Sequence, residues 1–257
     1  MTSEMPPGDA SAPETPPVRP PAERYPFWGY RDLILLLGLA LPIMIVSALI
    51  VQIAALFVPS GRPLPALVVL AAQFLAYGFW FLILWALIRF RYGKPFWPSL
   101  GWITPRQGTL RYALYGPLLA LAVGIGGALL QTPEMQMPMM ELLRDRISIV
   151  LVGVFAVSLG PLCEELAFRG FFLPLLARSL GPAAGVLVTA VIFSMLHGPQ
   201  YAWSWRHLLL ITSAGVAFGV VRLRTGSTAA ATVMHATYNL TFFAAYLTHL
   251  EETGGLW

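Results

Sequence analysis

The chain has 257 residues, of which 57% are hydrophobic and 11% charged, and its mean hydropathy is +0.71. A soluble domain carries charge at about a quarter of its positions, so this composition excludes an ordinary soluble protein and a disordered chain. The net charge of +4 comes from basic residues in short loops between apolar runs, a pattern of membrane orientation and not of nucleic-acid binding. The single cysteine, Cys163, excludes a disulfide framework. We therefore predict a polytopic protein of the lipid bilayer with no nucleic-acid partner.

The chain begins with a polar, proline-rich segment. Residues 1–24 contain seven prolines and few apolar side chains, so residues 1–26 are predicted to be a disordered cytoplasmic tail. No apolar signal-peptide region precedes residue 33, so we expect the first span to be retained. Tyr25, Phe27, Trp28 and Tyr30 are predicted to lie at the membrane interface in front of this span.

Seven apolar runs follow, each close to the length that crosses a bilayer as a helix. They cover residues 33–58, 64–88, 112–131, 147–177, 182–197, 207–221 and 227–248. The fifth and sixth are short, and the fourth is predicted to kink at Pro161. The sequence thus predicts an all-α transmembrane helical bundle of about seven spans, with six to eight as the range. We divide it into an N-terminal region of about three spans (27–146), a transmembrane core (147–250) and a short tail (251–257).

The basic residues predict the orientation of the chain. With a cytoplasmic N-terminus, eleven Arg and Lys residues lie in inner segments and four in outer segments, as the positive-inside rule expects. Fifteen arginines against one lysine, with abundant Ala, Pro and Gly, are typical of a GC-rich bacterial genome. We therefore expect an integral protein of the bacterial inner membrane with its N-terminus in the cytoplasm.

Two adjacent glutamates are the most informative polar residues of the apolar core. Glu164 and Glu165 are the only acidic residues between 147 and 250, and a charge inside a bilayer is costly unless it faces a partner or a cavity. Glu165 stands four residues before Arg169, the favourable spacing for an ion pair on a helix. Glu164 is turned about 100° away, so it is predicted to meet a group from another helix.

Two further polar pairs occur at helical spacing. His197 follows Phe193 by four residues in the fifth run, and Asn239 follows His235 by four residues in the seventh. At about 1.5 Å per residue, these groups and Glu164 lie roughly 12 to 22 Å from the inner ends of their runs. They are therefore predicted to share one buried site. The alternative for a single membrane His or Asn is a hydrogen bond between helices, and for Asn239 alone this is the stronger reading.

Three motifs thus follow one another on three separate predicted spans. They are Glu164-Glu165-x-x-x-Arg169, Phe193-x-x-x-His197 and His235-x-x-x-Asn239. In this order they resemble the CPBP family of intramembrane proteases, which includes type II CAAX prenyl endopeptidases and bacteriocin-immunity-like (Abi) proteins. The resemblance runs from about residue 147 to residue 247.

The resemblance implies an endopeptidase that hydrolyses a peptide bond of a membrane-associated protein or peptide. The catalytic residues it implies are Glu164, Glu165, Arg169, His197, His235 and Asn239. Glu164 would act as general base on a water, His197 would orient this water, and His235 and Asn239 would donate to the oxyanion. The family is described both as glutamate-dependent and as metal-dependent, so a divalent metal such as zinc on Glu164, His197 and His235 is the alternative.

Two other classes of function are compatible with these residues. A non-catalytic immunity or binding protein would keep the scaffold without hydrolysis, and mid-membrane Glu, His and Arg also form proton relays in transporters. The three motifs are intact and no internal repeat is visible, so proteolysis is the favoured interpretation. A bacterial origin makes prenylated substrates unexpected.

Overall fold

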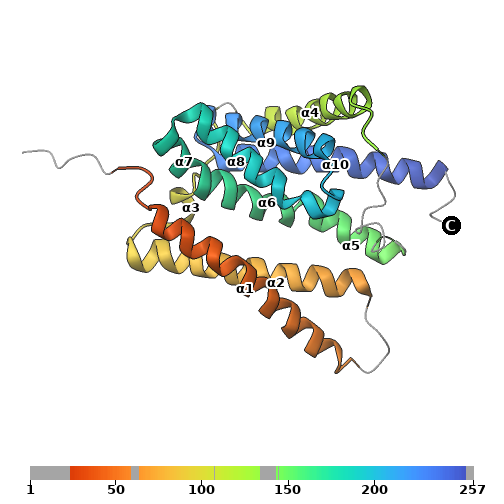
Figure 1. Cartoon of the computed structure of the whole chain (residues 1–257), viewed down its shortest axis with the longest axis horizontal. Helices are drawn as coiled ribbons and strands as arrows, with labels where there is room; N and C mark the ends of the chain where they lie inside the picture. The colour runs from red at the N-terminus through yellow and green to blue at the C-terminus, as the bar shows by residue number, and fades with distance from the viewer. Residues whose placement is uncertain (1–23, 59–63, 107, 134–142, 144, 253–257) are drawn as a thin grey trace, which may run out of the picture.

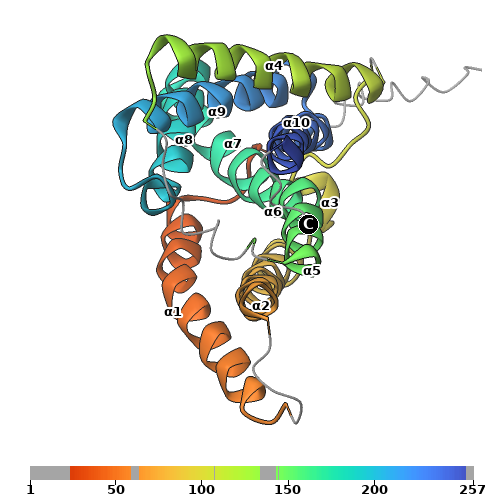
Figure 2. The ribbon, with the colours of Figure 1, turned by 90° about the vertical axis from the view of Figure 1, so that its right-hand side faces the viewer.

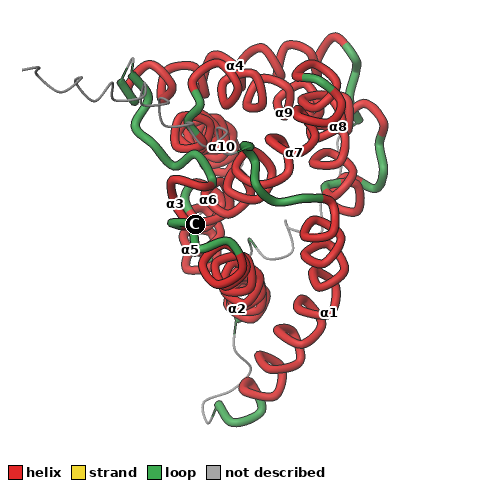
Figure 3. Tube along the Cα trace, turned by 90° about the vertical axis from the view of Figure 1, so that its left-hand side faces the viewer, coloured by secondary structure: helices red, strands yellow, loops and turns green. Residues whose placement is uncertain are grey.

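The computed structural model describes residues 24–58, 64–106, 108–133, 143 and 145–252, and within this part of the chain every regular element is a helix (Figures 1 and 3). The predicted all-α class is therefore confirmed. The α-helices are α1 (Tyr30–Ala55), α2 (Pro65–Ala86), α3 (Phe96–Ser99), α4 (Leu110–Leu129), α5 (Arg146–Val157), α6 (Leu159–Glu165), α7 (Leu173–Leu180), α8 (Pro182–Leu196), α9 (Trp205–Thr225) and α10 (Thr228–Glu252). Helices of other types are the π-helices η1 (Leu87–Arg91) and η3 (Leu166–Phe172) and the 3₁₀-helix η4 (Gly198–Tyr201). Residues 1–23 and 253–257 of the two predicted tails lie outside the described residues.

All seven predicted apolar runs are helical. Among the described residues, five stretches are long and apolar enough to cross a membrane, namely Tyr30–Ala55, Pro65–Arg91, Leu110–Leu129, Arg146–Leu180 and Trp205–Thr225. Helix α8 is apolar but has only 15 residues. Helix α10 has 25 residues, and its threonines, His235 and Asn239 lower its hydropathy. The chain is thus an integral membrane protein, and the first half of α10 lies in the interior of the bundle.

Helix α10 is the central helix of the bundle. It packs against α4, α9, α5 and α6, and Figure 2 shows it end-on between α4 and α9 on one side and α5 and α6 on the other. Helix α4 approaches it closely at Gly116, where a Cβ atom would lie 2.5 Å from the carbonyl oxygen of Met234 and 2.6 Å from the amide nitrogen of Tyr238. Small residues of this kind permit helix contact in lipid, where the hydrophobic effect does not drive association.

Helices α1 and α2 form a hairpin at the edge of the bundle (Figures 1 and 2). The indole nitrogen of Trp80 donates to the carbonyl of Leu36 at 3.0 Å and joins the two helices. Beyond this contact, α1 exposes large apolar side chains such as Leu41 (64% exposed) and Met44 (60% exposed). This surface suits the hydrocarbon region of a bilayer.

The segment before α1 is fixed to the core by Trp28. We expected Trp28 at the membrane interface, but its side chain is fully buried. Its ring stacks on that of Phe171 at 5.1 Å, and its indole nitrogen donates to the Phe171 carbonyl at 3.1 Å. Arg178 also donates to the backbone carbonyls of Pro26 and Trp28. Because the indole N–H finds a partner inside the protein, full burial satisfies both ends of this amphipathic ring.

The fourth apolar run is interrupted at Ser158, three residues before the expected kink at Pro161. Ser158 has φ −122° and ψ −77°, outside the helical region, and it separates α5 from α6. Pro161 has no N–H for the carbonyl of Val157, and its ring crowds that carbonyl, so the helix breaks upstream of the proline. The π-helix η3 then follows α6 directly. Such wider turns often occur at functional sites, because they change which side chains share a helix face.

Replacing Gly116 by Ala is expected to destabilise the protein, since the new methyl group meets backbone atoms of α10 that cannot move independently. Overpacking of this kind costs about 1–3 kcal/mol. Gly124 lies on the same helix with no atom within 4 Å of an added Cβ, so Gly124→Ala is the matched control. Thermal unfolding in detergent, followed by tryptophan fluorescence, should give a lower midpoint for Gly116→Ala only. Equal midpoints for the two variants would contradict this packing.

Helix α5 begins at a charged cap whose contribution depends on pH. The carboxylate of Asp145 accepts from the Ser148 hydroxyl at 2.6 Å and from the Ser148 amide at 2.9 Å, and these bonds lower the pKa of Asp145 below 3.8. A lowered pKa means that the stabilisation is complete above the unfolded pKa and is lost as pH falls through the folded pKa. The unfolding midpoint of wild type should therefore fall more steeply below about pH 4 than that of Asp145→Asn. Parallel pH profiles would show that the charge does not contribute.

Candidate active site

The core of the site is a fully buried ion pair. The side chains of Glu165 at the end of α6 and Arg169 in η3 are both 0% exposed, and Arg169 Nη1 donates to Glu165 Oε1 at 2.8 Å. The pair predicted from the sequence is therefore present. A buried pair needs additional hydrogen bonds, because removing two charges from water costs more than their attraction returns unless the geometry is good.

Helices α8 and α9 supply the remaining contacts of Arg169. Its Nη2 donates to the carbonyl of Gly215 in α9 at 2.9 Å. Its guanidinium also lies over the ring of Phe193 in α8 at 4.7 Å and over that of Phe218 in α9 at 5.3 Å. Cation–π contacts of this kind strengthen when the cation is removed from water. A Cβ at position 215 would lie 3.3 Å from Nη2, so the glycine leaves room for the guanidinium.

His235 of α10 joins the two glutamates. Its Nδ1 lies 2.9 Å from Glu165 Oε1, and its Nε2 lies 3.8 Å from Glu164 Oε2. The imidazole stacks on the Phe218 ring at 4.6 Å, which fixes the ring plane. In the neutral form, a hydrogen bond from Nδ1–H to Glu165 leaves Nε2 as an acceptor that faces Glu164. Two α6 carboxylates therefore meet opposite edges of one imidazole.

Glu164 and Glu165 differ in exposure. The Glu164 side chain is 24% exposed, whereas that of Glu165 is 0% exposed. Both Arg169 and His235 contact Oε1 of Glu165, and its Oε2 has no hydrogen-bond partner among the described residues. Glu165 is thus enclosed in protein contacts, while Glu164 is the carboxylate that a water or a substrate can reach.

His197 stands next to this cluster through an aromatic ring. It caps the C-terminus of α8, and its Nδ1 lies 2.8 Å from the carbonyl of Phe193. Its ring is 4.6 Å from the Phe193 ring, which in turn meets the His235 ring edge-on at 5.9 Å. With Nδ1–H donating to the Phe193 carbonyl, neutral His197 keeps Nε2 as an acceptor.

The side chain of Asn239 joins α10 to α5 through a hydrogen bond to the backbone. Its Nδ2 donates at 2.8 Å to the carbonyl of Ala156, the penultimate residue of α5. The break at Ser158 removes the regular helical partner of that carbonyl, and a buried carbonyl needs a replacement. The hydrogen bond between helices that we considered for Asn239 is therefore observed.

The structure brings Glu164, Glu165, Arg169 and His235 into one connected cluster, with His197 adjacent. It also includes two residues that the sequence analysis did not identify, Gly215 and Phe218. A glycine and a phenylalanine in an apolar helix give no sequence signal for a site, because both are common packing residues in membranes.

The proposed metal ligands do not form a metal site in this arrangement. Among the described residues there is no group of three or more His, Cys, Asp or Glu side chains placed to hold a metal ion. His197 turns Nδ1 to the Phe193 carbonyl, and His235 turns Nδ1 to Glu165. These Nδ1 contacts orient both rings and leave Nε2 free on each, an arrangement that metal-bound histidines also have.

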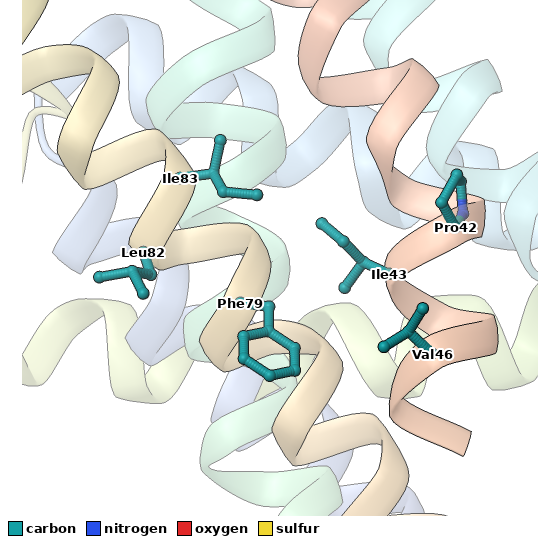
Figure 4. Close-up of a pocket in the computed structure, with 6 residues that line it drawn as sticks. All are labelled: Pro42, Ile43, Val46, Phe79, Leu82 and Ile83. Atoms are coloured by element: carbon teal, nitrogen blue, oxygen red, sulfur yellow. The ribbon is translucent and has the colours of Figure 1, made fainter. Parts of the chain in front are cut away.

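Two apolar grooves lie on the surface of α2, and none of the six predicted site residues lines either groove. The first, between α1 and α2, is lined by Pro42, Ile43, Val46, Phe79, Leu82 and Ile83 (Figure 4). The second, between α2, α3 and α6, is lined by Gly78, Phe81, Leu82, Trp85, Phe96, Trp97, Leu162, Cys163 and Leu166. The second groove thus passes along α6 beside the glutamates.

Comparison with known families identifies the part of the chain that carries the site. Residues 146–241 match the family model described as type II CAAX prenyl endopeptidase Rce1-like. This segment is similar to that family, and we refer to it as the Rce1-like domain. It extends from the start of α5 into α10 and contains all six predicted site residues, and it is consistent with the resemblance to CPBP family proteases. Comparisons with curated proteins and with solved structures found no match.

Removing Arg169 is expected to be more harmful than removing both members of its ion pair. Arg169→Met leaves Glu165 buried without its cation, which costs about 3–5 kcal/mol. Combining it with Glu165→Gln removes the unpaired charge and should restore part of the unfolding midpoint. Arg224→Met at an exposed position of α9 is the control. Yields and unfolding midpoints in detergent measure the effect, and a double variant less stable than Arg169→Met would refute this account.

Proposed function

We propose that this protein is an intramembrane endopeptidase in which Glu164 activates the hydrolytic water. The Rce1-like domain supports membrane proteolysis of a peptide or protein substrate. The observation that carries the role of Glu164 is the contrast between the two glutamates. Glu165 is buried and bonded to Arg169 and His235, while Glu164 is partly exposed beside the imidazole. A general base must have such access to the water it deprotonates.

The proposed reaction needs one water and no covalent enzyme intermediate. Glu164 takes a proton from the water as its oxygen attacks the carbonyl carbon of the scissile peptide bond, and the carbonyl becomes a tetrahedral oxyanion. The intermediate then collapses, the C–N bond breaks, and Glu164 returns the proton to the leaving amine. The products are a carboxylic acid and an amine, and the glutamate is regenerated.

His235 is proposed to hold the water together with Glu164. The 3.8 Å between Glu164 Oε2 and His235 Nε2 is too long for a direct hydrogen bond, but a water can donate to both atoms. Glu165 and Arg169 would act as positioning residues, because they fix the imidazole through Nδ1. His197 would orient the water through Nε2, or in its cationic form would stabilise the oxyanion. We assign Asn239 the structural role of holding α5 to α10.

We propose glutamate-dependent rather than metal-dependent catalysis. The position of Glu164 beside His235 Nε2, with a separation that one bridging water fits, supports this choice. We also propose that the protein resides in the bacterial inner membrane with its N-terminus in the cytoplasm. The distribution of Arg and Lys between the predicted inner and outer segments supports this orientation.

Glu164→Gln should abolish proteolysis while leaving the fold intact. The amide cannot accept the water proton, and the loss of a general base lowers kcat by about 10²–10⁴-fold. The assay is cleavage of a fluorogenic peptide library by purified protein in detergent. Asp145→Asn, the same carboxylate-to-amide change outside the site, should keep full activity.

Adding a chelator separates the two mechanisms. Wild-type activity that persists with chelator supports the metal-free mechanism. Activity that is lost with chelator and restored by zinc would contradict it and would favour Glu164, His197 and His235 as ligands. Full activity of Glu164→Gln would reject the proposed base, and a cellular phenotype that survives both Glu164→Ala and His197→Ala would favour a binding protein.

A further inference from the structure

Tyr77 of α2 is a partly buried tyrosine outside the Rce1-like domain. Gln73 stands one turn earlier on the same helix, and its Nε2 donates to the Tyr77 hydroxyl at 3.0 Å. A polar pair of this kind is unusual in an apolar membrane helix, where intramembrane polar groups face partners or cavities. We therefore expect the Gln73–Tyr77 pair to face a polar partner or a cavity and not lipid.

The ring of Tyr77 is held against the end of α5, just before α6. It stacks on the ring of Phe155 with centroids 6.1 Å apart and an interplanar angle of 9°. The Phe155 ring covers Gly160, since a Cβ at Gly160 would lie 3.9 Å from its Cδ1 and Cε1 atoms. Glu164 follows Gly160 by four residues on α6, so both lie on the same face of the helix.

Tyr77 lies on the stretch of α2 that faces α6. Gly78 directly follows Tyr77 on α2, and Cys163 directly precedes Glu164 on α6. The second groove confirms that this part of α2 lies beside α6, because Gly78 and Cys163 both line it. Helix α2 thus places Tyr77 beside the stretch of α6 that carries Glu164.

The hydroxyl is arranged as a donor. Its oxygen accepts the hydrogen bond from Gln73, and within the described residues its own proton has no acceptor. A hydroxyl oriented in this way is a preorganised donor, and such donors are most effective where negative charge develops during a reaction. In the proposed hydrolysis, that charge develops on the carbonyl oxygen of the scissile bond, next to Glu164.

The candidate donors on α10 are partly engaged. One N–H of Asn239 is bonded to the carbonyl of Ala156, and Nδ1 of His235 faces Glu165. A tetrahedral intermediate needs a donor about 2.7–3.1 Å from its oxyanion. The neutral donors that remain are the second N–H of Asn239 on α10 and, from the α2 side, the hydroxyl of Tyr77.

We infer that Tyr77 is a further catalytic residue, whose O–H donates to the carbonyl oxygen of the scissile bond as it becomes the oxyanion. Gln73 is its positioning residue. The phenol keeps its proton throughout, so the step adds no reactant and changes no bond beyond those of the hydrolysis. This inference rests on the proposed function, and it extends the active site to a helix that the family match does not include.

Tyr77→Phe tests this role, because it removes the hydroxyl and keeps the ring that stacks on Phe155. The expected result with the fluorogenic peptide library is a fall in kcat of roughly 100-fold or more, with KM nearly unchanged. The unfolding midpoint should stay at the wild-type value. Tyr115→Phe on α4 is the matched control, since Tyr115 is 40% exposed and lies on another helix, and it should retain wild-type kcat.

Gln73→Leu provides a second test if Tyr77→Phe does not fold. Leucine keeps the apolar packing and frees the hydroxyl to rotate, so kcat should fall by a smaller factor with KM unchanged. A wild-type kcat for Tyr77→Phe, or for a folded Gln73→Leu when Tyr77→Phe is unfolded, would overturn the inference. A change confined to KM would also overturn it, because a donor to the oxyanion acts on the transition state and not on substrate binding.

Glu164→Gln, assayed in parallel, separates this inference from the proposed function. If Glu164→Gln is inactive while Tyr77→Phe is fully active, the proposed base stands and the role of Tyr77 falls. If Glu164→Gln retains wild-type activity, or if the wild-type protein cleaves no peptide, the proposed function and the inference fall together.

Discussion

The arrangement of the helices around the site depends on one buried ion pair. Glu165 and Arg169 have no exposed surface, and in lipid or protein an unsatisfied charge of this kind would be prohibitively costly. The protein meets this cost with the Gly215 carbonyl, the His235 imidazole and the faces of Phe193 and Phe218. These groups come from α8, α9 and α10. The pair therefore fixes the positions of three helices relative to α6 and η3.

The irregular backbone of the fourth run is the second constraint. An uninterrupted helix from residue 146 to residue 180 would be one straight span, but the break at Ser158 and the π-helix η3 divide it. The break frees the Ala156 carbonyl, which Asn239 satisfies. Non-helical backbone at membrane depth is tolerated only where protein groups complete its hydrogen bonds. The polar residues of α10 thus serve both the backbone of α5 and the carboxylates of α6.

The hairpin of α1 and α2 has a different character from the Rce1-like domain. Most of its surface is apolar and exposed, and its grooves are lined by hydrocarbon side chains. Its polar side chains are concentrated at a few contacts, among them Trp80 with Leu36 and Gln73 with Tyr77. The hairpin covers α5 and α6 from the side opposite α10 (Figure 2), so α2 forms a wall next to the glutamates.

The sequence by itself determined the fold class, the seven helical runs and the Glu165–Arg169 pair, because hydropathy and i, i+4 spacing are local properties of the chain. It also determined that Glu164 and His235 are polar groups in an apolar setting. Only the tertiary structure decided that His235 contacts both glutamates, that Asn239 bonds to a backbone carbonyl, and that Trp28 is buried. Each of these outcomes depends on which faces of distant helices meet, and that choice is made by packing and by the need to satisfy every buried polar group together.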